Sequence, residues 1–203
     1  MDTRKIKLLV LLIIAMSCLQ FQCRRIFGCT EQKYSFNLPI VAYPDKEEVL
    51  VGDTLWFEIK HSILLTDHIT GEILDYSGAA NLGSAIEFSK LTDTLFSIKS
   101  VQKFDYILEK GVDVGRSFDL ERLKEYLFVE EDGYYLFKLG IVPKEPGIYL
   151  VLFSSAKDVY RHKDECTKAS FEMAFFNTDQ HYPLNPNYRG GNLVGRDYYF
   201  SVK

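Results

Sequence analysis

The stretch from Val51 to Ile59 constrains the fold of this chain more than any other. A polar Gly-Asp-Thr turn leads directly into Leu-Trp-Phe-Glu-Ile, where Leu, Phe and Ile occupy every second position. Successive side chains of a β-strand point to opposite faces, so the pattern predicts a turn and then a strand that buries Leu55, Phe57 and Ile59. We interpret Trp56, the only tryptophan, as a core or inter-sheet anchor rather than a ligand platform.

Other segments share this strand character. Aromatic residues make up 14% of the 203 residues, and together with Val, Ile and Thr they favour strands over helices. Pro39 lies in the segment 33–43 and predicts an edge or bulge position there, because proline cannot donate a hydrogen bond to a sheet ladder. We expect strands over 33–43, 55–60, 84–91, 134–142, 148–153 and 195–203, and one long or interrupted strand over 93–109.

One segment shows helical spacing instead. Leu120, Leu123 and Leu127 follow one another at i, i+3 and i+7, and a serine and an aspartate precede them as candidate N-caps. The spacing predicts one short α-helix over 117–128, inserted between strands.

The segment around Tyr149 resembles a feature of immunoglobulin-like sandwiches. A Pro146-Gly147 turn precedes a strand with Tyr149 as its third residue. In such sandwiches a tyrosine at this corner donates its hydroxyl hydrogen bond back to the upstream backbone. The resemblance implies an all-β, immunoglobulin-like antiparallel β-sandwich over residues 33–203, with Tyr149 in that role.

The N-terminus has the pattern of an export signal. Arg4, Lys5 and Lys7 precede an apolar run from Leu8 to Met16, which is too short to span a bilayer. The following Ala15 to Cys18 resembles the lipobox of bacterial lipoproteins. That resemblance implies an N-terminal signal helix within a signal peptide over 1–17, cleavage before Cys18, lipid attachment to the Cys18 thiol, and a tether over 18–32.

Two other cysteines compete for the role of Cys18. Cys23 follows a large, polar glutamine, and Cys29 is separated from the apolar run by two arginines. Cleavage without acylation and an uncleaved anchor also remain open. An exported chain sits where disulfides persist, so we predict a Cys29–Cys166 bridge, with free cysteines as the alternative.

Three pieces of the chain together resemble uncharacterised lipoproteins of Bacteroidota-type bacteria. These pieces are Ala15 to Cys18, Val51 to Phe57 and Pro146 to Tyr149. The resemblance implies a cell-envelope location, with a lipid anchor in the outer or inner membrane, and carries no known activity. Residues Leu-Gln-Phe-Gln follow Cys18 in place of the acidic cluster linked with surface export in such bacteria.

The sequence offers little for chemistry. The formal charge of −4 and the lack of a basic stripe exclude a nucleic-acid footprint. His162 and Cys166 are four apart, which without a second pair does not predict zinc. Asp179 and His181 could belong to a proton relay, but no nucleophile motif accompanies them. We expect no catalytic residue, no metal and no cofactor.

Residues 156–195 are the candidate contact surface. The segment is polar and rich in Pro, Asn and Gly, and long segments of this kind tend to be functional or mobile. Tyr182, Tyr188 and Arg189 are the candidate ligand contacts, because aromatic rings beside Asn and Arg can stack on a sugar or a peptide and hydrogen-bond it. Alternatively, these rings hold a long loop on its own domain.

Two functions fit these features. The first is a non-catalytic cell-envelope lipoprotein that acts as a binding or structural module for an unknown protein or glycan partner. The alternative is a carbohydrate-binding accessory lipoprotein of a glycan-uptake system.

The first prediction concerns the anchor. Radiolabelled palmitate should enter the wild-type chain and the Cys23→Ser variant but not Cys18→Ser, because only the Cys18 thiol receives the lipid. Gel fluorography of whole cells measures the label, and equal labelling of all three proteins would rule out Cys18 as the acylated residue.

Overall fold

The predicted central strand is present as β4 (Leu55–Ser62). The computed structural model describes residues 32–92, 97–115, 121–162, 164–186, 188 and 195–203. In β4, Leu55, Phe57 and Ile59 are fully buried, as the alternation predicted. The predicted signal peptide, Cys18, Cys23, Cys29 and most of the tether lie outside the described residues.

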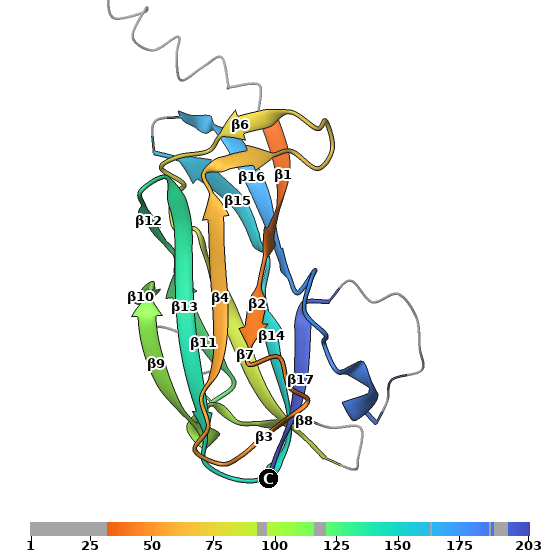
Figure 1. Cartoon of the computed structure of the whole chain (residues 1–203). Coiled ribbons are helices and arrows are strands. Elements are labelled where there is room, and N and C mark those ends of the chain that lie inside the picture. The colour runs from red at the N-terminus through yellow and green to blue at the C-terminus, as the bar shows by residue number, and fades with distance from the viewer. Residues whose placement is uncertain (1–31, 93–96, 116–120, 163, 187, 189–194) are drawn as a thin grey trace, which may run out of the picture. The chain divides into compact units, whose positions relative to one another are not determined.

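Two large sheets carry most of the described strands (Figure 1). One has the order β12-β13-β4-β2, with β9 also paired to β13; the other has the order β10-β11-β7-β14-β17-β3, with β8 beside β7. Besides β4, the five-stranded sheet contains β2 (Val41–Tyr43), β9 (Phe104–Lys110), β12 (Val129–Glu131) and β13 (Tyr134–Pro143). The seven-stranded sheet contains β3 (Glu48–Val49), β7 (Gly83–Leu91), β8 (Ser97–Lys99), β10 (Val112–Asp113), β11 (Leu123–Leu127), β14 (Gly147–Phe153) and β17 (Asp197–Val202).

Two smaller sheets complete the domain. A three-stranded sheet has the order β1-β16-β15, with β1 (Gln32–Pro39), β15 (Ala156–Arg161) and β16 (Asp164–Ala174). A hairpin pairs β5 (Leu64–Thr66) with β6 (Ile73–Asp75). Two short 3₁₀ helices are η1 (Val101–Lys103) and η2 (Tyr182–Leu184). Among the pairs whose register the described residues define, only β17 with β3 is parallel.

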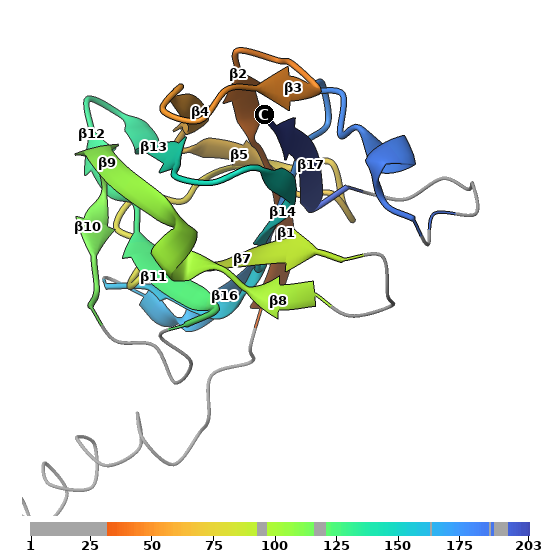
Figure 2. The same ribbon diagram turned by 90° about the horizontal axis from the view of Figure 1, so that it is seen from below.

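The two large sheets face each other across an aromatic core (Figure 2). The ring of Phe57 in the five-stranded sheet lies 5.8 Å from that of Phe153 and 5.7 Å from that of Tyr198, both in the seven-stranded sheet. Near one end of the core, Phe104 lies 5.0 Å from Tyr149 in an edge-to-face contact. These contacts confirm the prediction of an all-β sandwich.

Pro39 marks the point where the chain changes sheets. It is the last residue of β1, and the next residue donates its amide hydrogen bond to the carbonyl of Ala174, at 2.8 Å. From Val41 the chain continues as β2 in the five-stranded sheet. Since β1 and β2 are both edge strands, the edge position predicted for Pro39 is confirmed.

The predicted tyrosine corner is also present. The Tyr149 hydroxyl donates a hydrogen bond to the carbonyl oxygen of Glu145, four residues upstream, at 3.0 Å. The Glu145 carboxylate in turn binds Lys90 and Lys103, at 2.8 and 2.9 Å. These ion pairs hold the pKa of Glu145 down at about 2. The turn before β14 is therefore attached to the core at several points.

The prediction of a helix over 117–128 is wrong for its described part. Residues 123–127 form β11, which pairs antiparallel with β7 and buries Tyr126. Leu123 and Leu127 are separated by an even number of positions, so they share a face of a strand as well as of a helix. Pairing with β7 decided between the two. Ser117 to Leu120 lie outside the described residues.

Two further expectations need correction. Residues 156–195 are not a single polar segment, because β15 and β16 take up most of its first half. Trp56 is not a core anchor: it is half-buried on the outer face of β4. Gly140 lies opposite it, where a Cβ would come within 2.9 Å of the indole, and the Lys138 Nζ lies 4.7 Å from the ring centroid.

Residues 33–203 form the compact unit to which these sheets belong. In the described part of the chain, no helix has the length and the apolar character needed to cross a membrane.

The second prediction tests the tyrosine corner. Tyr149→Phe should lower the free energy of unfolding by about 1 kcal/mol, because it removes one buried hydrogen bond and keeps the ring. Urea unfolding followed by Trp56 fluorescence measures the change. The matched control is Tyr160→Phe, since Tyr160 is 38% exposed; equal effects of the two substitutions would contradict a role for the corner hydroxyl.

Candidate functional site

The candidate ligand contacts lie in the loop between β16 and β17, on the outer face of the seven-stranded sheet (Figure 1). β17 alternates strictly: Tyr198 and Phe200 point into the core, so Tyr199 points to the opposite face. The Tyr199 amide donates a hydrogen bond to the carbonyl of Gln180, at 3.1 Å, which brings the loop against the strand. The helix η2 follows directly and places Tyr182 over Tyr199.

Three tyrosine rings stack in series at this site. The rings of Tyr182 and Tyr188 are 5.4 Å apart and nearly parallel, at 17°. Tyr182 also lies 5.6 Å from Tyr199, in a tilted contact at 54°. Tyr199 is only 4% exposed, whereas Tyr182 and Tyr188 are half-buried. The structure therefore brings the two predicted tyrosines together, with Tyr182 enclosed between its neighbours; Arg189 lies outside the described residues.

Polar groups surround the ring stack. Asn185 donates a hydrogen bond to the Tyr199 hydroxyl, at 3.2 Å, and that hydroxyl donates to the Asp197 carboxylate, at 3.4 Å. Burial raises the pKa of Asp197 above its ordinary value, and the charge of Glu87 adds to this shift. Burial, together with the charge of Asp197, raises the pKa of Tyr182 and of Tyr199 to about 12. Both phenols are therefore hydrogen-bond donors at neutral pH.

A second carboxylate lies on the same face of the sheet. Leu152 in β14 is paired with Glu87 on one side and with Asp197 on the other, which puts the two Cα atoms about 10 Å apart. Glu87 is already engaged, since its Oε1 lies 2.6 Å from Arg122 and accepts a hydrogen bond from Ser89, at 2.8 Å. Its carboxylate is thus oriented by its neighbours.

Sequence reasoning missed Tyr199, Asp197 and Glu87 as members of this site. Their only signal in the sequence is an outward position in a predicted strand. Neighbouring strands far apart in sequence bring Glu87 and Asp197 to one face, so the pairing register was needed to find them.

His181 attaches the other side of the loop. It is buried in the left-handed conformation, with its Nε2 3.4 Å from Asp45 and 3.4 Å from the Tyr198 hydroxyl. Its amide donates a hydrogen bond to the Asp179 carboxylate, at 2.9 Å. Asp179 and His181 are therefore neighbours, as their spacing suggested, and they join the loop to the segment between β2 and β3.

The structure describes one of the two cysteines in the predicted disulfide. Cys166 is disulfide-bonded. Its predicted partner Cys29 lies outside the described residues, so that pairing stays a prediction. Within the ranges that the structure describes, no three His, Cys, Asp or Glu side chains converge on a point where a metal could bind.

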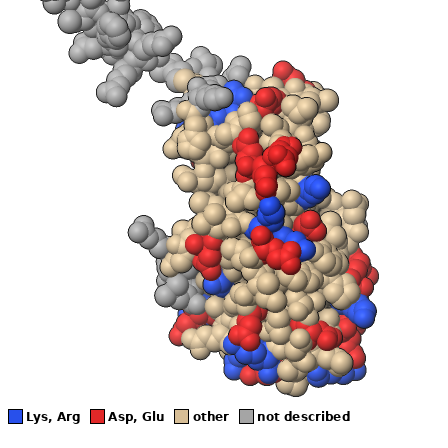
Figure 3. Space-filling model, turned by 60° about the vertical axis from the view of Figure 1, so that its left-hand side comes forward, with Lys and Arg blue, Asp and Glu red and all other residues tan. Residues whose placement is uncertain are grey.

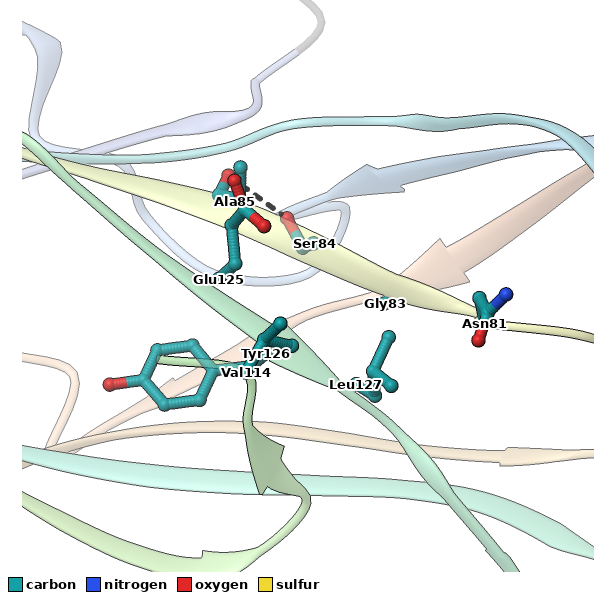
Figure 4. Close-up of a pocket in the computed structure, with 8 residues that line it drawn as sticks. All are labelled: Asn81, Gly83, Ser84, Ala85, Val114, Glu125, Tyr126 and Leu127. Carbon is teal, nitrogen blue, oxygen red and sulfur yellow. Dashed lines mark hydrogen bonds between the residues drawn. The ribbon is translucent and has the colours of Figure 1, made fainter. Parts of the chain in front are cut away.

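A surface pocket of about 340 Å³ lies between β7 and β11 (Figure 4). Its lining consists mainly of small and apolar residues, with one carboxylate, that of Glu125. The Ser84 hydroxyl is already bonded to backbone carbonyls, at 2.9 and 3.2 Å. The ring of Tyr126 extends away from the other lining side chains (Figure 4). The pocket lacks the converging polar groups of a specific site.

Charged side chains of both signs are interleaved on the face that carries β9, β12 and β13 (Figure 3). Lys110 pairs with Glu131, and Lys138 pairs with Glu109 at 2.6 Å. These exposed pairs contribute little to stability.

Comparison of the chain with protein-family models, with curated proteins and with solved structures finds no match. The function therefore has to be argued from the residues of the site.

The third prediction concerns the half-buried carboxylate of Asp197. Asp197→Asn should raise the free energy of unfolding at pH 7, because the folded state binds the Asp197 proton more tightly than the unfolded state and so disfavours the ionised form. The gain should shrink as the pH falls towards the ordinary value of 3.8. Urea unfolding at pH 7 and pH 4 measures both effects.

Asp105→Asn is the control for this prediction. Asp105 is a 71% exposed carboxylate paired with Lys144, so its substitution should change stability little at either pH. A loss of stability in Asp197→Asn at pH 7 would contradict the assigned cost of burying the charge.

Proposed function

We propose that this chain is a non-catalytic cell-envelope lipoprotein whose β-sandwich acts as a binding or structural module. The sequence supports the location through the apolar run and the Ala15 to Cys18 box, with the anchor at Cys18 in the outer or inner membrane. The contact surface is the described part of the loop between β16 and β17, residues 176–186 and Tyr188.

The observation that carries the binding role is the stack of Tyr188, Tyr182 and Tyr199. It holds the loop on the sheet, and the bonds of His181 hold its other side. A loop fixed before binding loses less conformational entropy when a partner arrives. The loop therefore presents a preorganised surface that a partner could bind without reordering it.

A second candidate function is carbohydrate binding as an accessory to glycan uptake. It is favoured by the half-buried ring of Tyr188, whose backbone amide donates a hydrogen bond to the Asn185 carbonyl, at 3.0 Å, and which stacks on Tyr182. The Asn185 side chain and the Asp197 carboxylate both bond the hydroxyl of Tyr199, the next ring of the stack. An aromatic face packs on the apolar C–H face of a sugar, while amide and carboxylate groups bind its hydroxyls. Tyr182, Tyr188 and Arg189 would be the contacts.

The fourth prediction separates the two functions. A soluble 19–203 fragment, which keeps Cys29 as the predicted partner of Cys166, should bind no glycan on an array, and crosslinking in the native envelope should capture a protein partner. Tyr188→Ala should reduce that crosslinking about tenfold, the effect of losing one interface anchor worth roughly 1.4 kcal/mol. Tyr160→Ala is the matched control, because Tyr160 is an exposed tyrosine on β15, outside this loop.

If the fragment binds a glycan, and Tyr188→Ala abolishes this binding while Tyr160→Ala preserves it, the carbohydrate function is supported and the protein-partner function is contradicted. If Tyr188→Ala leaves the crosslinking unchanged, the loop is not part of the contact surface.

A further inference from the structure

The β5–β6 hairpin exposes the most solvent-accessible large apolar side chains of the described residues. Ile69 is 75% exposed and Ile73 is 69% exposed, and Leu64 adds a third side chain at 56%. Scattered apolar residues are common on protein surfaces, but three on one short hairpin form a local patch. Such a patch indicates an interaction surface.

The hairpin holds these side chains outward in a defined conformation. Leu65 pairs with Leu74 and is 1% exposed, so one face of the hairpin is anchored in the core. Thr66 and Ile73 are paired on the opposite face and therefore point to solvent. The exposure of Ile73 is thus a consequence of the strand register.

The tip of the hairpin is closed by the buried Asp67 carboxylate. It accepts hydrogen bonds from the Thr70 amide at 2.9 Å, the Thr70 hydroxyl at 2.7 Å and the Ser35 amide at 2.7 Å. These bonds hold the pKa of Asp67 below its ordinary value despite its burial. Ile69 belongs to this hydrogen-bonded turn, so the turn fixes the backbone from which its exposed side chain projects.

The same contacts fix where the hairpin lies in the domain. Ser35 donates to Asp67 and accepts a hydrogen bond from the His68 amide, at 2.7 Å. Ser35 is near the start of β1, so the patch lies at the end of the sandwich where the chain enters the domain, opposite the C-terminus (Figure 1). A fully extended tether over 18–32 spans about 50 Å at most. Anchoring at Cys18 therefore keeps this end of the domain within about 50 Å of the bilayer.

The residues around the patch suit contact with a membrane whose lipids carry little net charge. Glu72 and Asp75 are acidic, and Arg161 donates a hydrogen bond to the Asp75 carbonyl, at 2.6 Å. Ile63, just before β5, donates to the carbonyl of Gly133, which brings the exposed ring of Tyr134 to the same end. Aromatic and aliphatic side chains together are typical of interfacial contact, whereas acidic neighbours disfavour anionic lipid.

We propose that Leu64, Ile69 and Ile73 dock on the bilayer that holds the Cys18 lipid. The inference rests on the proposed lipoprotein function and adds a lipid-contacting surface to it. The hairpin end then faces the membrane, and the opposite end of the sandwich, with the C-terminus, faces away from it.

The test places a fluorescent reporter on the hairpin of the full-length acylated protein. Trp56→Phe removes the only native tryptophan, and Ile69→Trp or Ile73→Trp then supplies the single reporter. The protein is reconstituted into phosphatidylcholine vesicles whose acyl chains are brominated, which quenches tryptophan at bilayer depth. The control is Ile98→Trp, because Ile98 is 54% exposed on β8, towards the other end of the domain (Figure 1).

Both hairpin reporters should be quenched at least about twofold more than the Ile98→Trp control, since interfacial side chains insert roughly 5–10 Å. Equal quenching of all three reporters would overturn the docking, as would hairpin reporters that are unquenched but crosslink to a second copy or another protein. Palmitate labelling of the same samples separates the two proposals: absence of label overturns anchor and docking together, whereas label without selective quenching overturns docking alone.

Discussion

The burial of the Phe57 ring between the two large sheets is the contact on which the rest of the structure depends. Phe57 meets Phe153 of β14, Phe175 just after β16 and Tyr198 of β17, with ring centroids 5.7 to 6.0 Å apart. One side chain of β4 therefore joins strands from the middle and the end of the chain. Aromatic side chains bury the largest apolar areas, so this cluster makes a large contribution to packing the sheets together.

Aromatic rings on the outer faces of the sheets fix loops and cover backbone rather than joining the sheets. The stack of Tyr182 and Tyr188 on Tyr199 holds a loop on the outer face of one sheet, and Trp56 covers Gly140 on the outer face of the other. In both places a ring covers backbone that would otherwise be open to water. The described part of this loop thereby gains a fixed surface without forming a strand.

The two ends of the sandwich differ in character. One end carries the apolar β5–β6 hairpin beside the start of β1, held by the Asp67 carboxylate. The tyrosine corner closes the core through the bond from Tyr149 to Glu145 and the two lysine pairs. In the lipoprotein that we propose, a module tethered at the β1 end would present this loop on its side to a partner.

Local alternation and turn chemistry were enough to predict β4, β7, β13, β14 and β17, the edge position of Pro39 and the corner role of Tyr149, but not β11, β15 or β16. The spacing of Leu123 and Leu127 fits both a helix and a strand, so only pairing with β7 could decide between them. Alternation put Trp56 on the face opposite Phe57, but only the register showed Gly140 beneath its ring. Glu87, Asp197 and Tyr199 meet through strands distant in sequence, and the exposure of Ile73 follows from its pairing with Thr66. These features were decided by tertiary structure because a strand's own pattern specifies its two faces and not its neighbours.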